Sequence, residues 1–533
     1  MEKQSYNIFF DLHTVSGIVI SVLLYVIFFA GSFSFFRDEI VNWERNEAVT
    51  VRKAIDANAD VLLDSVAKNY ALFGRDITLR RNYDDRSVMV DLSNSKDTSV
   101  AQTGDFFYLD TKTFETSSYE ASYTLGEFLY RLHFFAQIPY PAGYYLSGFT
   151  ALFFFFAILT GILVHWKKII PNFYVFRPWA KLKTVWTDAH TALGTIGLPF
   201  QVVYAISGAF LMINLVLVAP NVLVLYQGDQ KKIYEDLGYG HASHPFENKK
   251  LDQAVKINDL VLATKKKWRG FDVTEIEINN YGDEGMHITL VGEVPNAVKF
   301  TGLGEITYKG ANGEIIGQAK DPYKPTSYLD GVKNSLYRLH FGDYGGYGLK
   351  LISFVLGLLS CFVIISGILI WLEARNKKHI PEKRKRFNNT VGHIYLAICL
   401  TLYPVTALSF IVTKLVPRAL DPSRQTILYS VFFLSWLLLS VFFWWRKNNY
   451  ITNKYTLLTG GLLGILIPLV NGVVTGNWIW LSLAAQQSDF LLVDALWLVI
   501  SLMAFYTVCR LKRPTTKSVL SEDGIEVALD DLR

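Results

Sequence analysis

The sequence predicts an all-α polytopic membrane bundle of about eight transmembrane helices, with small α+β domains outside the membrane. The chain has 533 residues, of which 51% are hydrophobic and only 19% are charged, a balance untypical of a soluble globular protein. A helix needs about 20 mostly apolar residues to cross a hydrocarbon core about 30 Å thick. Eight segments meet this requirement, near residues 12–36, 145–166, 188–218, 349–372, 391–413, 426–445, 456–479 and 489–510.

The basic residues predict how the chain is oriented in the bilayer. Lysines and arginines cluster in the connections 167–187 and 373–390, after the sixth apolar segment and after the eighth. These connections lie on one side of an eight-helix path, so the positive-inside rule places both termini in the cytoplasm. We therefore expect a multi-pass protein of a bacterial inner membrane, surrounded by lipid bilayer and without a nucleic-acid partner.

This path divides the chain into membrane, outer and cytoplasmic parts. Residues 1–36 form the first transmembrane helix, 37–128 an outer domain, 129–166 a boundary segment and the second helix, 167–187 a cytoplasmic loop, 188–218 the third helix, 219–335 a second outer domain, 336–372 a boundary segment and the fourth helix, 373–390 a basic cytoplasmic loop, 391–510 four appended helices and 511–533 a cytoplasmic tail. In the second outer domain, residues 251–267 have helical apolar spacing and residues 271–278 alternate like a strand. Residues 306–317 are typical of a hairpin with a glycine-containing turn.

A repeat relates the first helix to the third and the second to the fourth. The pattern Asp-x-His-Thr-x-x-Gly occurs at residues 11–17 and again at 188–194, and the hexapeptide Leu-Tyr-Arg-Leu-His-Phe occurs at 129–134 and at 336–341. Both copies start on the cytoplasmic side, so the first four helices are predicted to form a parallel two-fold repeat with sites between facing helices. The four appended helices have no counterpart.

Four repeated histidines are the candidate ligands of two haem groups. His13 and His190 occupy equal depth on matching helices near the cytoplasmic side, and His133 and His340 occupy matching positions at the outer boundary. Polar metal-binding side chains inside a bilayer are costly and indicate function, and two facing imidazoles are what a bis-histidine haem needs. We expect His13 and His190 to share one iron and His133 and His340 the other. The simpler interpretation, that each histidine makes an ordinary helix–helix hydrogen bond, stays open.

Small and basic residues near these histidines extend the hypothesis. Gly17 and Gly194 lie four residues after the inner histidines, where a missing side chain leaves room for a flat macrocycle. Arg131 and Arg338, in the repeated hexapeptide, could bind haem propionates or could anchor the chain at lipid headgroups.

Two further histidines stand outside the repeat. His165 is matched by Trp371 in the second copy, and His393 belongs to the appended helices. Each could serve a further haem or metal site, or could be an ordinary interfacial histidine. The three cysteines all lie in predicted helices, which excludes a Cys-x-x-Cys-His haem attachment and a cysteine-ligated iron–sulfur cluster.

The chain resembles the PepSY-associated transmembrane helix family, a bacterial iron-regulated inner-membrane group that includes ferric-siderophore reductases. The resemblance rests on residues 12–17, both hexapeptides, and the segments 160–168, 176–200 and 306–317, and covers roughly residues 8–375. It implies PepSY-like outer domains, haem b bound by helix histidines, and electron delivery to periplasmic ferric chelates. By position, the haem-ligand roles fall on the four repeated histidines, and His165 is a plausible addition.

Together these observations predict a transmembrane oxidoreductase of iron acquisition. It would pass electrons through two haem b groups to a periplasmic ferric chelate such as a ferric siderophore. No Gly-x-Gly-x-x-Gly nucleotide fingerprint occurs in the cytoplasmic segments, so the donor is expected to be a quinol, a flavin or a partner reductase. Two alternatives stay open: a transporter or permease for a siderophore or metal, and a PepSY-type regulator of periplasmic proteases.

Overall fold

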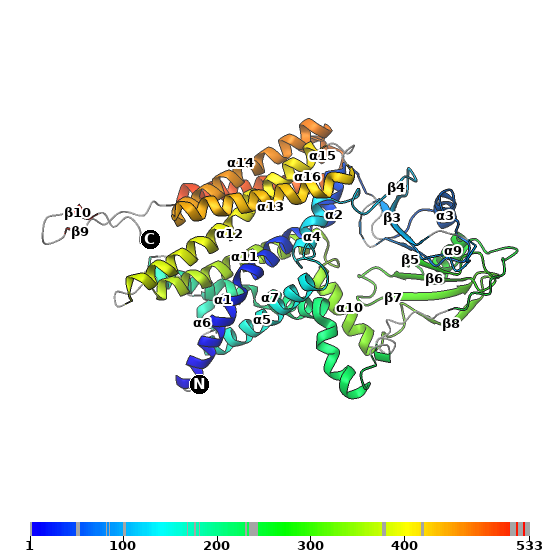
Figure 1. Ribbon diagram of the computed structural model, residues 1–533, viewed down its shortest axis with the longest axis horizontal. Helices are drawn as coiled ribbons and strands as arrows, with labels where there is room; N and C mark the ends of the chain where they lie inside the picture. The colour runs from blue at the N-terminus through cyan, green and yellow to red at the C-terminus, as the bar shows by residue number, and fades with distance from the viewer. Residues whose placement is uncertain are drawn as a thin grey trace. The chain divides into compact units, whose positions relative to one another are not determined.

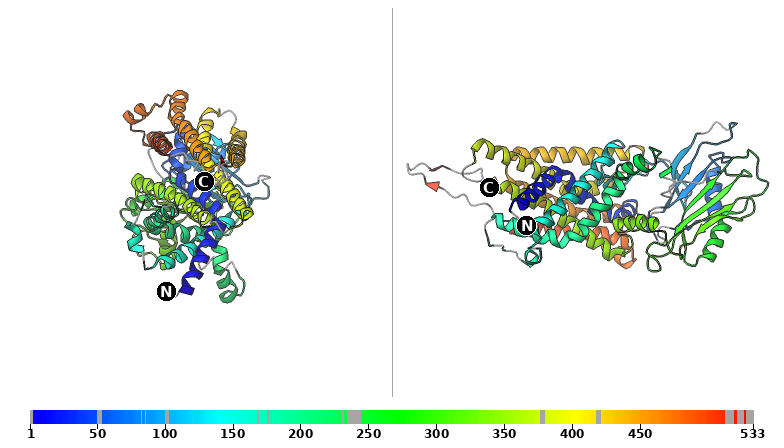
Figure 2. Two further views of the ribbon diagram at one scale, coloured as in Figure 1. Left: turned by 90° about the vertical axis from the view of Figure 1, so that its left-hand side faces the viewer. Right: turned by 90° about the horizontal axis from the view of Figure 1, so that it is seen from below.

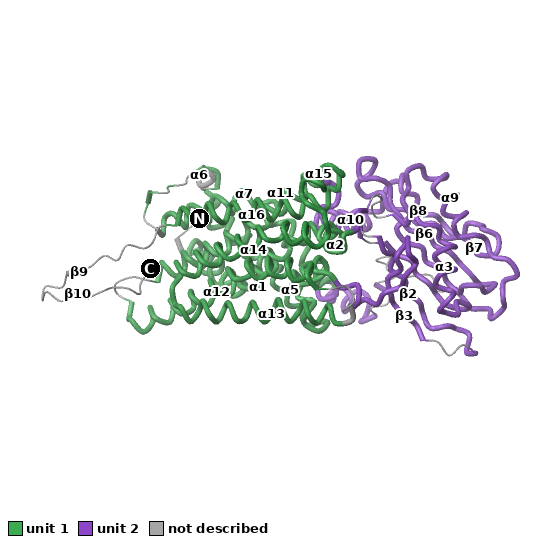
Figure 3. Tube along the Cα trace, turned by 90° about the horizontal axis from the view of Figure 1, so that it is seen from above, with its two compact units in different colours: residues 1–46, 124–214, 347–533 green, residues 47–123, 215–346 purple. Residues whose placement is uncertain are grey.

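The computed structural model describes most of the chain, and it falls into two compact units (Figure 3). The helical unit comprises Met1–Asn46, Thr124–Asn214 and Tyr347–Arg533, and the sheet unit comprises Glu47–Tyr123 and Leu215–Gly346. The described residues are 3–49, 54–81, 83–84, 86–99, 103–167, 169–174, 177, 179–180, 182–229, 232–233, 244–375, 380–416, 421–511, 519–520 and 526–527. The expected cytoplasmic tail at 511–533 lies largely outside them.

Among the described residues, eight helices are long and apolar enough to cross a membrane, which confirms the expected count. They are α1 (Lys3–Ser34), α5 (Ala142–His165), α7 (Leu182–Leu225), α11 (Gly346–Ala374), α12 (Glu382–Leu415), α13 (Asp421–Arg446), α14 (Asn449–Thr475) and α16 (Ser488–Arg510). Within the helical unit they form a bundle, seen from three directions in Figures 1 and 2. The chain is a multi-pass membrane protein by these criteria.

The helices owe their form to long apolar sequences whose backbone polar groups can be satisfied only within the helix itself. Helix α14 begins at Asn448, whose side chain accepts a hydrogen bond from the Ile451 amide, and it ends at Gly476 in the left-handed conformation. Helix α7 is longer than the expected third span and breaks its regular geometry at Ile213. Prolines 404 and 468 stand inside α12 and α14, a placement that neighbouring helices allow in membrane bundles.

Among the described residues, the helical unit also contains four short helices. They are α2 (Arg37–Arg45), α4 (Leu125–Leu132), α6 (Ile169–Tyr174) and α15 (Ile479–Ala484). Helix α2 packs against α4 and α16, and most of its side chains are buried, including charged ones. In the tail, the described pieces β9 (Val519–Leu520) and β10 (Glu526–Val527) pair antiparallel.

The sheet unit is built on one eight-stranded antiparallel sheet with the order β4-β3-β2-β1-β5-β6-β7-β8. Its strands are β1 (Ile77–Arg80), β2 (Ser87–Leu92), β3 (Asp105–Asp110), β4 (Thr116–Ser117), β5 (Asp272–Asn279), β6 (His287–Glu293), β7 (Leu303–Lys309) and β8 (Ile315–Lys320). The pair β1–β5 joins the two outer segments, with Ile77 opposite Ile278. Strands from both segments therefore share one sheet, whereas the sequence had suggested two separate domains.

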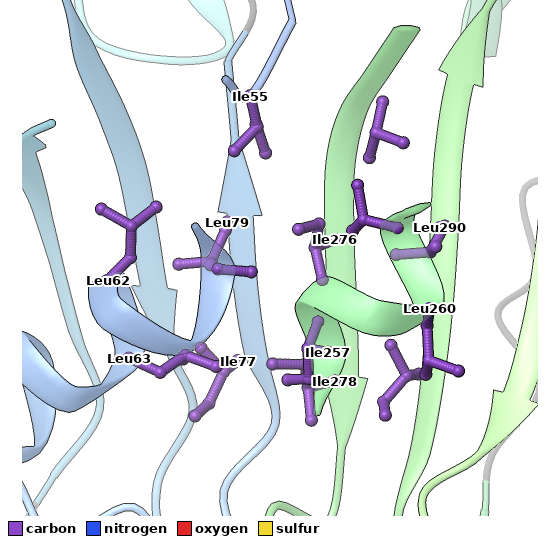
Figure 4. Packing of buried hydrophobic residues seen from close by; sticks show 14 of the residues in the cluster. Ile55, Leu62, Leu63, Ile77, Leu79, Ile257, Leu260, Ile276, Ile278 and Leu290 are labelled. Atoms are coloured by element: carbon purple, nitrogen blue, oxygen red, sulfur yellow. The ribbon is translucent and has the colours of Figure 1, made fainter. Parts of the chain in front are cut away.

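Helices α3 (Ala59–Ala67) and α9 (Ile257–Lys267) cover one face of this sheet. Leu62 and Leu63 of α3 and Leu260 of α9 meet the inward side chains of the central strands, among them Ile77 and Ile276 (Figure 4). The alternation expected at 271–278 is that of β5, the helix expected at 251–267 is α9, and the hairpin expected at 306–317 is β7–β8. Helix α10 (Tyr328–Phe341) follows the last strand and carries the second hexapeptide.

Candidate functional site

A cavity of about 500 Å³ lies inside the helical unit, between α1, α5, α7 and α11. Its volume falls in the range of cavities that hold a small ligand or cofactor. Apolar side chains such as Leu24, Phe154 and Leu198 line its deeper part, and polar side chains gather where the helices reach their basic ends. Three predicted site histidines line this one cavity: His13, His165 and His190.

The His13 and His190 rings face each other across the cavity. Their centroids are 6.2 Å apart and their planes are inclined by 71°. Two imidazoles that bind one metal from opposite sides at about 2.0–2.1 Å have centroids roughly 6.3 Å apart, once about 1.1 Å from nitrogen to centroid is added on each side. The spacing of these two rings therefore fits a pair of axial ligands to one metal ion.

Hydrogen bonds to neighbouring helices determine which nitrogen of each ring carries the proton. His13 Nδ1 lies 2.8 Å from the Ala157 carbonyl oxygen of α5, and His190 Nδ1 lies 2.9 Å from the Val363 carbonyl oxygen of α11. A carbonyl oxygen only accepts, so each Nδ1 carries the proton and donates. Each Nε2 is then left with its lone pair, the form in which histidine binds a metal.

Glycines let each ring pack closely against the neighbouring helix. A Cβ atom added at Gly161 would lie 3.1 Å from His13 Cε1, and one added at Gly367 would lie 3.2 Å from His190 Cε1. These glycines fall in the matching sequences at 160–163 and 366–369, so the two rings have equivalent surroundings. The sequence contained this signal in the repeated Gly-Ile-Leu after Thr160 and Ser366, but it gave these glycines no role by itself.

Gly17 and Gly194 leave space on the cavity side, as the sequence had suggested. A Cβ atom added at Gly17 would meet nothing within 4 Å, and one added at Gly194 would meet only Val363 Cγ1, at 3.9 Å. Both glycines line the cavity. A planar macrocycle between the two rings would rest against this bare backbone, so the residues present fit a bis-histidine haem.

Basic and aromatic residues stand at the polar end of the cavity. Besides His165, they include Lys183 of α7 and Arg375, which follows α11. The Arg375 guanidinium lies over the Trp371 ring, 4.4 Å from its centroid. In the sequence, Lys183 and Arg375 indicate only the orientation of the chain, because basic residues at a cytoplasmic helix end are expected in any membrane protein.

The outer candidates are distributed over both units. His133 caps α4 in the helical unit, its Nδ1 hydrogen-bonded to the Tyr130 carbonyl oxygen, and burial lowers the pKa of this histidine to about 4. Arg131, on the same helix, lies 3.6 Å from Glu127. His340 is in α10, so it belongs to the sheet unit, whereas His133 belongs to the helical unit. Their sharing of an iron stays a prediction.

Arg338 has acidic and amide partners inside the sheet unit. It is buried, pairs with Glu293 and donates to Asn296. A propionate role for Arg131 and Arg338 stays a prediction, and in this structure both guanidinium groups already face carboxylates. His393 lies apart from the cavity, where its Nδ1 is 2.7 Å from the Asn449 side-chain oxygen and links α12 to α14.

A second polar cluster, which sequence analysis missed, surrounds α2. Its contacts join α2 to α11, α13 and α16 through Glu39–Lys350 (2.6 Å), Asn42–Asp489 (2.9 Å), Trp43 Nε1–Asp494 (2.8 Å) and Glu44–Arg424 (2.6 Å). A further bond, Asn471–Asp494 (3.0 Å), joins α14 to α16. We call these residues the α2 cluster. The sequence showed only a short polar stretch after the first apolar segment and two acids, Asp489 and Asp494, in the last.

Comparison with known proteins agrees with the resemblance drawn from the sequence. Residues 10–374 match the family model described as the PepSY-associated TM region. A Pseudomonas aeruginosa protein, named "Uncharacterized protein PA4219", is 22% identical over 280 residues, which cover 49% of this chain and 66% of that protein. The match thus spans slightly less than two thirds of that relative. Helices α12 to α16 follow the family match in the chain.

Proposed function

Because this chain belongs to the family of PepSY-associated TM regions, we propose that it is a b-type haem protein that carries electrons across a membrane. The proposed reaction is the reduction of a ferric chelate, such as a ferric siderophore, on the outer side. The protein would then be a transmembrane oxidoreductase of iron acquisition.

The facing pair of His13 and His190 is the observation that supports this function best. A helix–helix hydrogen bond uses one nitrogen of each imidazole and needs no cavity between the rings. Here each Nδ1 bonds a backbone carbonyl, and among the described residues no hydrogen bond occupies either Nε2. The rings stand at the spacing of two axial ligands within a cavity of about 500 Å³.

A haem b held between these rings would supply one-electron redox chemistry. The chain's own groups set the conditions for it. The Ala157 and Val363 carbonyls orient the rings and make each Nε2 a stronger donor to a metal. The apolar side chains of the deeper cavity exclude water, which lowers the local dielectric constant and favours a site of low net charge.

A second redox site toward the outer face follows from the width of the membrane. The hydrocarbon core is about 30 Å thick, too wide for useful transfer in one step. We propose His133 and His340 as ligands of an outer haem, with the ferric chelate reduced on that side. Reduction favours release, since Fe(II) is a poorer match than Fe(III) for the hard oxygen donors of a siderophore.

The test is a spectrum followed by a reduction assay. Purified protein should show a Soret band, and its α and β bands should sharpen when dithionite is added. His13→Ala and His190→Ala should each remove the same haem and abolish reduction of an external ferric chelate in proteoliposomes with an internal donor.

His393→Ala is the matched control, since this histidine also lies in a long helix but does not line the cavity. It should keep both the spectrum and the activity. A folded, colourless wild-type protein would refute the proposal and would favour the transporter or the protease-regulator alternative.

A further inference from the structure

The cavity changes character along its length. Its deeper part is lined by aliphatic and aromatic side chains, whereas its mouth carries Tyr6, Asp11, Lys183, Thr187 and Arg375. A ligand that matches both ends has an apolar body and a polar, charged edge.

Arg375 is a cation whose guanidinium is held in place, and no carboxylate in the described part of the chain forms an ion pair with it. Its guanidinium stacks on Trp371 at 4.4 Å, well within the range of a cation–π contact, and one of its nitrogens donates to the Trp371 carbonyl oxygen at 3.4 Å. Within the described residues, no carboxylate lies within ion-pair distance of it. Burial and the positive charge of Arg384 lower the pKa of Arg375. A bound anion would therefore stabilise the charged form of this guanidinium.

Lys183 supplies a second cation from α7. It is exposed at the cavity mouth, and no salt bridge to it occurs among the described residues. Asp11 is the acid on this part of the wall, and it attracts Arg375 only at a distance. Its repeat counterpart, Asp188, is different, because both of its oxygens are taken by Arg177 at 2.8–2.9 Å. The mouth therefore retains positive charge.

We propose that Arg375 and Lys183 bind the carboxylate groups of the cavity's ligand, which on the proposed function are the two propionates of the inner haem. This inference rests on the proposed haem site and adds its orientation: the propionate edge faces the cytoplasmic mouth and the apolar edge faces Leu24 and Phe154. Arg375 and Lys183 are positioning residues, and the histidines remain the metal ligands.

The chemistry suits this assignment. A guanidinium with a fixed plane can donate two parallel hydrogen bonds to one carboxylate, and the Trp371 ring keeps that plane fixed before the ligand arrives. A lysine on the opposite helix is a mobile point charge that can reach a second carboxylate. An anionic lipid headgroup offers similar chemistry, and the experiment separates the two sources.

The experiment compares haem with its dimethyl ester, in which both propionates are blocked. Apoprotein in detergent is titrated with each ligand, and binding is followed by the Soret band. The wild type should bind haem at least about tenfold more tightly than the ester, because charge-assisted hydrogen bonds are lost in the ester. In Arg375→Gln combined with Lys183→Gln, this preference should fall to near onefold, while the low-spin spectrum of a bis-histidine haem persists.

Two further measurements sharpen the test. Arg375→Lys, which keeps the charge but loses the planar stacked group, should retain only part of the preference. Arg446→Gln removes an exposed cation at the end of α13, away from the cavity, and should leave the preference unchanged. The double variant should also shift the haem midpoint potential negatively, because loss of positive charge disfavours the added electron.

Equal binding of haem and its ester by the wild type would overturn this inference about the propionates. It would still be consistent with the proposed haem site. An effect of the double variant that appears only when anionic lipid is present would assign the two cations to headgroups instead. If neither ligand bound, the proposed function itself would fail, which is a different outcome.

Discussion

The cavity and the α2 cluster both place polar groups inside the helical unit, but they use them in opposite ways. In the α2 cluster, polar side chains bond directly to one another: Asp494 accepts from Trp43 and Asn471, and Glu44 pairs with Arg424. In the cavity, His13 and His190 each donate a hydrogen bond from Nδ1 to a backbone carbonyl, and among the described residues no hydrogen bond occupies either Nε2. Hydrogen bonds made within a cluster indicate a structural role, whereas a histidine lone pair without a hydrogen bond, beside a cavity, indicates a binding role.

The glycines show the same contrast. A Cβ atom at Gly464, between α14 and α16, would strike the Ser501 hydroxyl and would lie 3.1 Å from Trp497 Cε3. A Cβ atom at Gly17 would meet nothing within 4 Å. Glycine allows α14 and α16 to pack closely together, whereas in the cavity wall it leaves space that no side chain occupies. Substitutions in the two regions should therefore change the free energy of unfolding to different extents.

Asp494→Ala should lower the free energy of unfolding by about 3–5 kcal/mol, because Trp43 Nε1 loses its acceptor and Asn471 Nδ2 keeps only the longer bond to the Asn477 carbonyl oxygen. Unfolding in detergent, followed by circular dichroism during SDS titration, measures this loss. Asp252→Ala, which removes an exposed acid of the sheet unit, is the control and should change stability by less than about 0.5 kcal/mol. Equal effects of the two substitutions would contradict a structural role for the α2 cluster.

Glu39 should make stability depend on pH. Burial raises the pKa of Glu39 from 4.5 to about 7, although Lys350 opposes the shift and Asp38 adds to it. Between these values the native state holds a proton that the unfolded state has lost, so stability is highest below pH 4.5 and falls as pH rises to about 7. The loss should be about 3 kcal/mol.

Thermal unfolding at pH 5 and pH 8 checks this dependence. The wild type should lose more stability over that interval than Glu39→Gln, in which the titrating group is gone. Parallel pH profiles for the two proteins would show that Glu39 does not titrate there.

Gly464→Ala should destabilise the helical unit by about 1–3 kcal/mol through overpacking between α14 and α16. The Ser501 hydroxyl is the main obstacle, so Ser501→Ala in the same chain should recover most of the loss. Detergent unfolding of the single and double variants measures the coupling. Simple addition of the two effects would mean that the contact is relieved by some other movement.

Gly17→Ala should leave the free energy of unfolding unchanged or raise it by up to about 1 kcal/mol, since alanine favours the helix and the new Cβ enters open space. Gly17→Leu, at the same position, should fold but fail to bind the proposed haem, because its larger side chain fills the cavity. The haem-to-protein ratio and the unfolding curve together check both variants. A strong destabilisation by Gly17→Ala would show that the cavity wall is closely packed after all.

Local sequence was enough to predict the membrane helices and the pair of His13 and His190, but not the groups that surround this pair. Apolar runs of about 20 residues can satisfy their backbone polar groups only as helices, so eight spans followed without any tertiary information. The repeated Asp-x-His-Thr-x-x-Gly pattern also paired His13 with His190, because matching positions on matching helices lie at equal depth.

Tertiary structure alone decided what surrounds those residues. The carbonyls of Ala157 and Val363, which choose the ring nitrogen, belong to other helices and leave no mark in the sequence, since every residue has a carbonyl. The joining of β1 to β5 and the burial of Glu39 beside Lys350 likewise depend on segments far apart in the chain. A sequence determines which side chains prefer lipid, water or a metal, but a partner at long range is fixed only when packing brings the two groups to the same place.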